Sequence, residues 1–251
     1  MTVKNQSLIE MLRERWWRKV KEHQLEKTEI VIKARPLTPT EAIGKPARRD
    51  YPLLKGKEVM IEADIKGCKG QAFTDEPLNF TGKLNSIYTL PLKNNGNRAL
   101  LVATINATYN LLGLVQNTRH CKDNGPEECG KELAKYLVEK HGKNIRVGMI
   151  GYQPAIVYHL SKSFTKFRVS DMDPENIGKK RNNIVIETYL NNDDIIEWSD
   201  IILATGTTII NNTINRILMK AYGKEIYFYG VTIAAAAYEL KLNRLCFKSL
   251  S

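Results

Sequence analysis

The sequence VGMIGYQPAIVYHLSKSFTKFRVSDMDPENIG, residues 147–178, decides the fold. Residues 147–150 form a short apolar run that stops at Gly151 and predicts a strand. Pro154 suits the first residue of a helix, because its φ is fixed and it has no N–H, and Gln153 before it suits the cap. Residues 166–170 predict a second strand, which ends at Asp171. The pattern is that of a strand–helix–strand unit.

The spacing within this stretch resembles half of a dinucleotide site. Asp171 stands twenty positions after Gly151, where such a unit places the acid that binds a ribose. The turn carries one glycine where the fingerprint has three. We therefore expect a Rossmann-like half with a modified ligand loop and not an ordinary NAD site.

The composition is that of a soluble globular protein, with 43% hydrophobic and 26% charged residues among 251. No run of eighteen apolar residues predicts a membrane span, and the first residues lack the features of a secretory signal. Four cysteines in a chain of this length do not form a disulfide framework. We expect a cytoplasmic protein.

The formal net charge is +11. Such a charge suits nucleic acid when Lys and Arg cluster, but here they are spread along the chain with no interleaved aromatics and no helix-turn-helix pattern. A solvated basic surface, or capture of acidic small ligands, explains the charge better. The expected partner is a small-molecule ligand, with neither nucleic acid nor membrane, and a homo-oligomer is possible on this sequence.

The N-terminal half predicts a small α+β module. We expect an amphipathic helix over 7–24, a strand over 28–33, a loop over 35–52, a hairpin over 58–75 and an apolar helix over 97–113. Residues 116–131 are polar and rich in Gly and Pro, which marks a boundary. The predicted organisation is a first domain over 1–115, a linker and helix over 116–143, and a second domain over 144–251.

The second domain alternates strands and helices. After a helix over 131–139 and the opening stretch, strands are predicted over 183–187, 200–205, 225–229 and 244–247. Helices are predicted between them over 193–199, 207–222 and 231–240. This alternation favours an α/β fold with a doubly wound parallel sheet and right-handed crossovers.

Ligands of such sheets lie beyond the carboxyl ends of the strands. Polar or glycine-containing segments follow the strands here, and some of them begin helices, where free N–H groups favour anions. The candidate ligand-binding residues are Gly151, Tyr152, Gln153, Asp171, Asp173, Asn176, Thr205, Gly206, Thr207, Thr208, Asn211 and Asn212.

Structural roles compete with each of these assignments. Thr207 and Thr208 can cap their own helix, although caps alone explain Thr-Gly-Thr-Thr followed by Asn-Asn less well. Asp173 and Asn176 are common turn formers, and two carboxylates two residues apart can instead bind a hard divalent cation.

A second group of candidates is His120, Cys121 and Cys129, with Cys246 distant in the sequence. Imidazole and thiolate suit zinc or iron, but the spacing contains no Cys-x-x-Cys pair. Buried structural cysteines are the alternative. The signatures of serine hydrolases, Walker ATPases and zinc proteases are absent.

The segment TGTTIINNT at 205–213, with the IGYQPA turn and the DMDPENIG loop, resembles a known family. The chain is similar, over nearly all its length, to the uncharacterised family described as "putative heavy-metal chelation". That resemblance implies an enolase-N-terminal-like first domain, a Rossmann-like second domain and an active site in the cleft between them. It implies no reaction, because fold and function separate.

Three hypotheses follow from the sequence. The first is a protein that binds a nucleotide-like or anionic metabolite in an interdomain cleft, in a pathway linked to heavy-metal chelation. The second is a metal-binding or metal-delivery protein that uses His120, Cys121 and Cys129. The third is a methyltransferase that uses S-adenosylmethionine. The sequence leaves open whether the protein is an enzyme, and whether its cofactor is a divalent metal or a nucleotide-like molecule.

Overall fold

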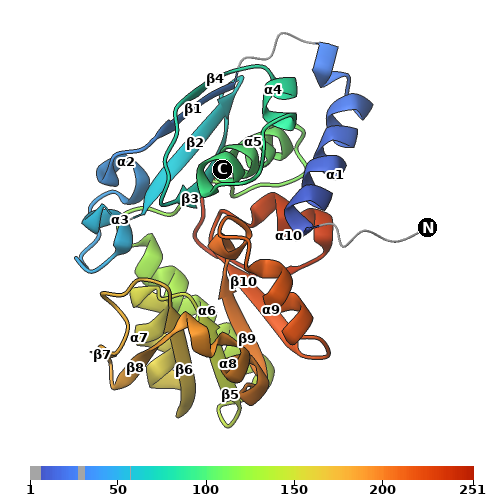
Figure 1. The fold of residues 1–251 in the computed structure, drawn as a ribbon. Helices are drawn as coiled ribbons and strands as arrows, with labels where there is room; N and C mark the ends of the chain where they lie inside the picture. Colours follow the sequence, from blue (N-terminus) through green and yellow to red (C-terminus); the bar gives the residue numbers. More distant parts are fainter. Residues whose placement is uncertain (1–6, 28–31, 57) are drawn as a thin grey trace.

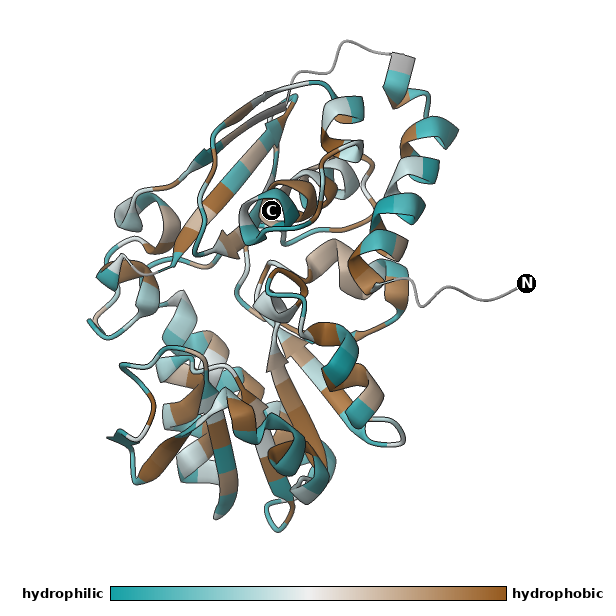
Figure 2. Ribbon diagram, viewed as in Figure 1, coloured by the Kyte–Doolittle hydropathy of each residue, from teal (hydrophilic) through white to brown (hydrophobic). Residues whose placement is uncertain are grey.

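A computed structural model describes residues 7–27, 32–56 and 58–251 (Figure 1). In this part of the chain, a four-stranded antiparallel sheet lies beside a seven-stranded sheet that is mostly parallel. The strands β9 and β10 are largely hydrophobic, whereas much of the outer helix α1 is hydrophilic (Figure 2). The protein is thus a mixed α/β fold with two sheets.

The antiparallel sheet has the strand order β3-β2-β1-β4. The elements of this half are α1 (Leu8–Glu22), η1 (Leu25–Lys27), β1 (Ile32–Pro36), α2 (Pro39–Ile43), α3 (Pro52–Lys55), β2 (Val59–Ile65), β3 (Cys68–Thr74), β4 (Phe80–Gly82), α4 (Leu84–Tyr88) and α5 (Asn95–Leu111). Helix α5 begins after Asn94, whose side chain accepts from the N–H of Asn97. It then packs across β2 and β3.

The hairpin predicted over 58–75 is confirmed as β2 and β3. Ile65 pairs with Cys68 around a two-residue turn in which Lys66 and Gly67 both have positive φ, the geometry that matches the twist of a hairpin. Gly70 brings α5 close, since a Cβ at this position would lie 2.1 Å from the N atom of Ala107. A side chain there would push the helix off the hairpin.

The larger sheet has the order β11-β10-β9-β5-β6-β8-β7. Its half contains α6 (Gly125–His141), β5 (Arg146–Ile150), α7 (Pro154–Ser163), β6 (Lys166–Asp171), β7 (Lys180–Arg181), β8 (Ile184–Thr188), η2 (Tyr189–Asn191), α8 (Asn192–Trp198), β9 (Ile201–Thr205), η3 (Gly206–Ile209), α9 (Ile214–Lys220), β10 (Glu225–Tyr229), α10 (Ala234–Leu240) and β11 (Asn243–Leu245). The sheet is parallel except for β7, which pairs antiparallel with β8.

Alternate residues of the central strands enter two different cores. Val147 and Met149 of β5 belong to a cluster formed with α6 and α7. Ile202 and Ala204 of β9 face the other way, into a cluster that includes α9 and α10. This second core also contains Trp16 of α1 and much of α5, so the two halves of the chain share buried surface.

Two of the predicted helices differ from the structure. The helix expected over 207–222 is divided into η3 and α9, because Asn212 has φ +60° and the Asn211 side chain accepts from both the N–H and the hydroxyl of Thr213. Helix α6 starts well before the predicted residue 131. Pro126 is in its first turn, a position that suits proline.

Two predictions for the N-terminal half also need correction or fall outside the structure. The loop expected over 35–52 contains α2, which starts at a capping box formed by Thr38 and Glu41. Most of the strand predicted over 28–33 lies outside the described residues. Strand β1 begins at Ile32.

The chain order of the parallel strands creates a topological switch point. From β5 the chain continues to β6 and β8 on one side, and it then returns to β9 and β10 on the other side. The connections that leave β5 and β9 therefore diverge, and this opens a crevice at the carboxyl ends of these two strands. The fold directs a ligand site to this edge of the sheet.

Candidate functional site

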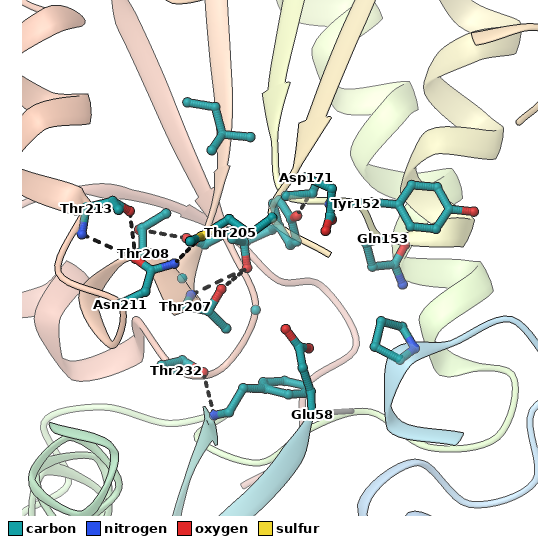
Figure 3. Close-up of a pocket in the computed structure, with 18 of the residues that line it drawn as sticks. Glu58, Tyr152, Gln153, Asp171, Thr205, Thr207, Thr208, Asn211, Thr213 and Thr232 are labelled. Carbon is teal, nitrogen blue, oxygen red and sulfur yellow. Dashed lines mark hydrogen bonds between the residues drawn. The ribbon is translucent and has the colours of Figure 1, made fainter. Parts of the chain in front are cut away.

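A pocket lies at the switch point (Figure 3), with about 1010 Å³ between its walls, part of it open to solvent. One wall comes from the ends of β5, β6, β9 and β10, and the other from residues of the N-terminal half. The lining residues from the strand ends include Gly151, Tyr152, Gln153, Asp171, Met172, Thr205, Gly206, Thr207, Thr208, Asn211, Tyr229 and Thr232. Those of the N-terminal half and the segment after it include Ile43, Tyr51, Pro52, Leu53, Glu58, Phe73 and His120.

The turn after β5 is tightly built. Gly151 has φ +93°, and a Cβ on it would lie 2.6 Å from Cγ2 of Thr205. Its N–H donates to the carbonyl of Ser170 at 2.9 Å, and its carbonyl accepts from the Tyr229 hydroxyl at 2.8 Å. Both polar groups of this glycine are therefore used within the protein.

The helix start beyond this turn offers few free N–H groups. Gln153 caps α7 as predicted, and its side chain accepts from the N–H of Ile156 at 2.6 Å. Pro154 has no N–H to give. The Tyr152 N–H is also occupied, because it donates to Asp171 at 2.6 Å. The turn is thus poorly suited to hold a phosphate.

Asp171, the predicted ribose acceptor, braces two loops. One carboxylate oxygen accepts from the Tyr152 N–H and the other from the Asp173 N–H, each at 2.6 Å, and the Asn176 side chain also contacts the group. Burial raises the pKa of Asp171, and the hydrogen bonds from Asp173 and Tyr152 oppose that shift. The carboxylate holds the β5 and β6 loops in register.

Asp173 and Asn176 complete this loop and do not line the pocket. Asp173 accepts from the N–H of Glu175 through its side chain and from that of Asn176 through its carbonyl. Asn176 is buried. These are the contacts of turn-forming residues.

The segment after β9 presents hydroxyls to the pocket. The Thr205 and Thr207 hydroxyl oxygens are 3.1 Å apart, and Thr208 donates to the carbonyl of Thr205 at 2.8 Å. Gly206 allows close packing, since a Cβ on it would be 2.9 Å from the N atom of Ile233. Packing therefore explains this glycine, while Thr205 and Thr207, both half-buried, line the pocket.

Asn211 and Asn212 have different positions. Asn211 lines the pocket, and its amide nitrogen is 3.2 Å from Sδ of Met172, which links the β9 and β6 loops. Asn212 does not line the pocket. Its left-handed backbone, at φ +60°, makes the turn that separates η3 from α9, a conformation that asparagine tolerates.

The opposite wall is anchored to the large sheet by a buried asparagine. Asn106 of α5 donates to the carbonyls of Gln71, Val231 and Thr232, and it accepts from the N–H of Ala235 at 2.9 Å. The Thr232 hydroxyl in turn accepts from the N–H of Phe73 at 3.1 Å. These contacts fix β3 beside the end of β10.

Glu58 projects from this wall into the pocket (Figure 3). It directly precedes β2 and is half-buried. Burial raises the pKa of Glu58 to about 7, and the nearby carboxylates of Asp171, Asp75 and Asp173 add to the shift. A carboxyl group with such a pKa can exchange a proton near neutral pH.

The sequence analysis did not identify Glu58 or Tyr229 as candidates. Burial, followed by the charge of Asp171, raises the pKa of Tyr229 well above its ordinary value. Tyr229 ends a predicted strand, so a search for polar side chains at the carboxyl ends of strands would have included it. Glu58 carries no such signal, because only tertiary packing brings the start of β2 to this edge of the other sheet.

The cysteine and histidine candidates lie apart from most of the pocket. His120 lines it, and its Nδ1 is buried without a hydrogen-bond partner among the described residues. Cys121 and Cys129 are buried, and Cys129 shares a hydrogen bond with Cys246 after β11. Burial raises the pKa of Cys121 to about 12, which keeps its thiol protonated.

Residues 135–243 match the model of family DUF364, described as "putative heavy-metal chelation". The family predicted from the sequence is thereby confirmed over these residues. No curated protein matches the chain. Two solved structures from this family are likewise of proteins with unknown function.

Two solved structures of this family resemble the chain. A protein with unknown function from Desulfitobacterium hafniense is similar over 73% of each chain, with a TM-score of 0.50 and 15% identity. One from Pyrococcus horikoshii is similar over 90% of this chain and 79% of its own, with a TM-score of 0.48 and 15% identity. At this identity the first likeness concerns the fold alone.

The family description raises the question of a resident metal. Within residues 7–27, 32–56 and 58–251, no group of three or more His, Cys, Asp or Glu side chains has an arrangement that holds a metal ion. Burial raises the pKa of the Cys121 thiol, which disfavours the thiolate form that binds metals. The donor set of His120, Cys121 and Cys129 does not fit a heavy metal in this arrangement.

No helix of the described chain is long and apolar enough to cross a membrane.

Proposed function

We propose that the protein binds a small nucleoside-like metabolite in the pocket at the switch point. In this proposal, an enolase-N-terminal-like module over 1–115 and a Rossmann-like module over 144–251 form the two walls, and residues 116–143 join them. The heavy-metal chelation of the family description then refers to the pathway of the ligand and not to a metal held by this chain.

The observation that carries the proposal is the coincidence of pocket and switch point. Gly151, Asp171 and Thr205, which follow or end three neighbouring parallel strands, all line the same pocket. Glu58 and Phe73 close it from the other sheet. A pocket with convergent polar groups at a switch point is the usual position of a small-molecule site in α/β proteins.

The lining supports a nucleoside-like ligand better than an anionic one. Hydroxyls of Thr205, Thr207 and Thr232, together with the amides of Gln153 and Asn211, provide hydrogen-bond donors and acceptors without charge. Among the described residues that line the pocket, none is Lys or Arg. The net charge of +11 thus belongs to other surfaces.

A blocking substitution tests the site. Thr207→Phe places a ring in the pocket, and native mass spectrometry of the purified protein should show that a co-purified or screened metabolite no longer binds. Tyr222→Ala is the control, because Tyr222 is 92% exposed and outside the pocket. Unchanged binding in Thr207→Phe would place the ligand elsewhere. The same spectra report the oligomeric state, for which a homo-oligomer is predicted.

Two other functions stay predictions. A metal-binding protein that uses His120, Cys121 and Cys129 requires these side chains to rearrange, and elemental analysis of protein purified without an affinity tag tests it. Less than one metal ion per chain would exclude it. For a methyltransferase, Asp171 would have to accept from ribose hydroxyls in addition to its two backbone donors. A calorimetric titration with S-adenosylmethionine that shows no heat would exclude that function.

A further inference from the structure

The pocket carries acidic side chains, whereas the molecule as a whole has a positive net charge. Carboxylates stand on both walls, Glu58 on one and Asp171 on the other, and no described lining residue is Lys or Arg. Arg48, which lies near Tyr152, is held 3.5 Å from both Asp50 and Glu127. Its charge is therefore paired outside the pocket.

Glu58 is the unusual member of this pair. Its carboxylate makes no hydrogen bond or ion pair with any residue of the described chain, although it is half-buried and points into the pocket (Figure 3). Among the described residues, the ionisable groups near it are the acids Asp171 and Asp173 from β6 and its loop, Asp75 after β3, and Tyr229 from β10. A buried acid that faces other acids is costly unless something else compensates it.

Asp171 differs from Glu58 because the protein itself supplies hydrogen-bond donors to its carboxylate. Two backbone N–H groups donate to its two oxygens. These donors favour the ionised form of Asp171 against its burial, and a negative charge there favours a cation in the space between it and Glu58. Phe73 and Tyr189 also line the pocket, and aromatic faces attract organic cations.

We propose that the ligand of this pocket carries a positively charged nitrogen, as an amine or an amidine, which binds to the Glu58 carboxylate and faces Asp171. The proposal rests on the proposed function, because it names the chemical class of the ligand in the same pocket. It explains why an acid with no partner in the described chain stands in a wall whose other lining side chains are apolar or carry rings.

A consequence of this assignment is proton-linked binding. The pKa of Glu58 is raised to about 7, so a large share of the group is protonated below that pH. A cation selects the ionised form, and binding therefore releases a proton and strengthens as the pH rises from 6 to 8. A neutral or anionic ligand does not select the ionised form.

Three probes of the same ring size test the charge: benzamidine as the cation, benzamide as the neutral amide and benzoate as the anion. Saturation-transfer NMR at pH 8 on the full chain measures their affinities. We expect benzamidine to bind at least about tenfold more tightly than benzoate, a factor that corresponds to ~1.4 kcal/mol. Thr207→Phe should abolish that binding, which places it in the pocket.

Glu58→Gln, which keeps the shape and removes the charge, should lose most of the preference for benzamidine and its dependence on pH. Glu139→Gln on α6 is the matched control, because Glu139 pairs with Lys135 outside the pocket. Benzamidine should bind this control as it binds the natural protein.

Different outcomes separate the two proposals. If benzamide or benzoate binds as tightly as benzamidine and Thr207→Phe abolishes all three, the pocket is a ligand site and the charge assignment is wrong. The charge assignment is also wrong if Glu58→Gln leaves the preference unchanged. If Thr207→Phe affects the binding of no probe and of no co-purified metabolite, the pocket assignment fails together with the charge assignment.

Discussion

Two acids face the same pocket from different sheets, and their surroundings are opposite. Asp171 ends β6 of the parallel sheet and accepts from two backbone N–H groups. Glu58 precedes β2 of the antiparallel sheet and has no partner among the described residues. The first acid is part of the framework, whereas the second is available to a ligand.

The comparison shows that the position of each acid and the groups around it give the two acids separate roles. The strand-end rule points to one edge of the sheet as the place where a ligand is expected, and Asp171 lies there. At that edge, however, the protein's own loops need acceptors for their N–H groups, and the strand-end acid supplies them. The acid that is available to a ligand comes from the part of the chain that the rule does not consider.

The largest expected effect is that of Asp171→Ala. The N–H groups of Tyr152 and Asp173 would lose their acceptor, which should lower the free energy of unfolding by about 3 kcal/mol. Urea denaturation followed by circular dichroism measures this change. Asp171→Asn keeps one oxygen acceptor and should lose about half as much. A loss below ~1 kcal/mol in Asp171→Ala would show that the acid is not a brace and would remove the contrast with Glu58.

The next prediction compares alanine substitutions at two glycines in the loops that follow strands. Gly151 and Gly230 have φ of +93° and +94°, so alanine is equally strained at both. A Cβ at Gly151 also meets Cγ2 of Thr205 at 2.6 Å, whereas at Gly230 the space is open within the described structure. We expect Gly151→Ala to cost about 3 kcal/mol of unfolding free energy and Gly230→Ala about 1 kcal/mol. Equal losses in thermal or urea unfolding would mean that strain alone, and not the contact with the β9 loop, accounts for Gly151.

The third effect has the opposite sign. Glu58→Gln should stabilise the protein at pH 8 by about 2 kcal/mol, because it removes an ionised acid that has no partner in the described chain. The pKa of Glu58 is raised when the protein is folded, so its protonated form favours folding below pH 4.5, the ordinary pKa of the group. This contribution is lost as the pH rises through about 7.

The variant should therefore equal the natural protein near pH 4.5 and exceed it increasingly up to pH 8. Urea unfolding at a series of pH values measures the difference. If Glu58→Gln destabilises the protein at pH 8, Glu58 has a stabilising partner and resembles Asp171. Glu139→Gln provides the surface control, with a change within ~0.5 kcal/mol.

Local patterns account for the elements that the sequence predicted well. The β5–α7–β6 unit follows from an apolar run, a Gln153–Pro154 helix start and a second β-rich run, all of which depend on neighbours in the chain. The division of residues 207–222 was not predicted, because periodic isoleucines indicate one helix. A hydrogen bond from Thr213 to the Asn211 side chain decides otherwise.

The site was predictable only in part for the same reason. Gly151, Gln153 and Thr205–Thr208 line the pocket, since strand ends of a parallel sheet meet at one edge. Asp173, Asn176 and Asn212 were chosen by the same rule but do not line it. Which side chains of a loop face the ligand depends on the turn geometry, and a polar sequence does not specify it.

The sequence by itself determined the strands, most of the helices and the edge of the sheet where ligands are expected, because these follow from periodicity, turn residues and chain order. Only the tertiary structure decided the chemistry of the pocket. Burial and neighbouring charges act through space, and they satisfy Asp171 while leaving Glu58 without a partner among the described residues. Two carboxylates that look alike in the sequence thus differ because one has backbone donors within reach and the other faces further acids.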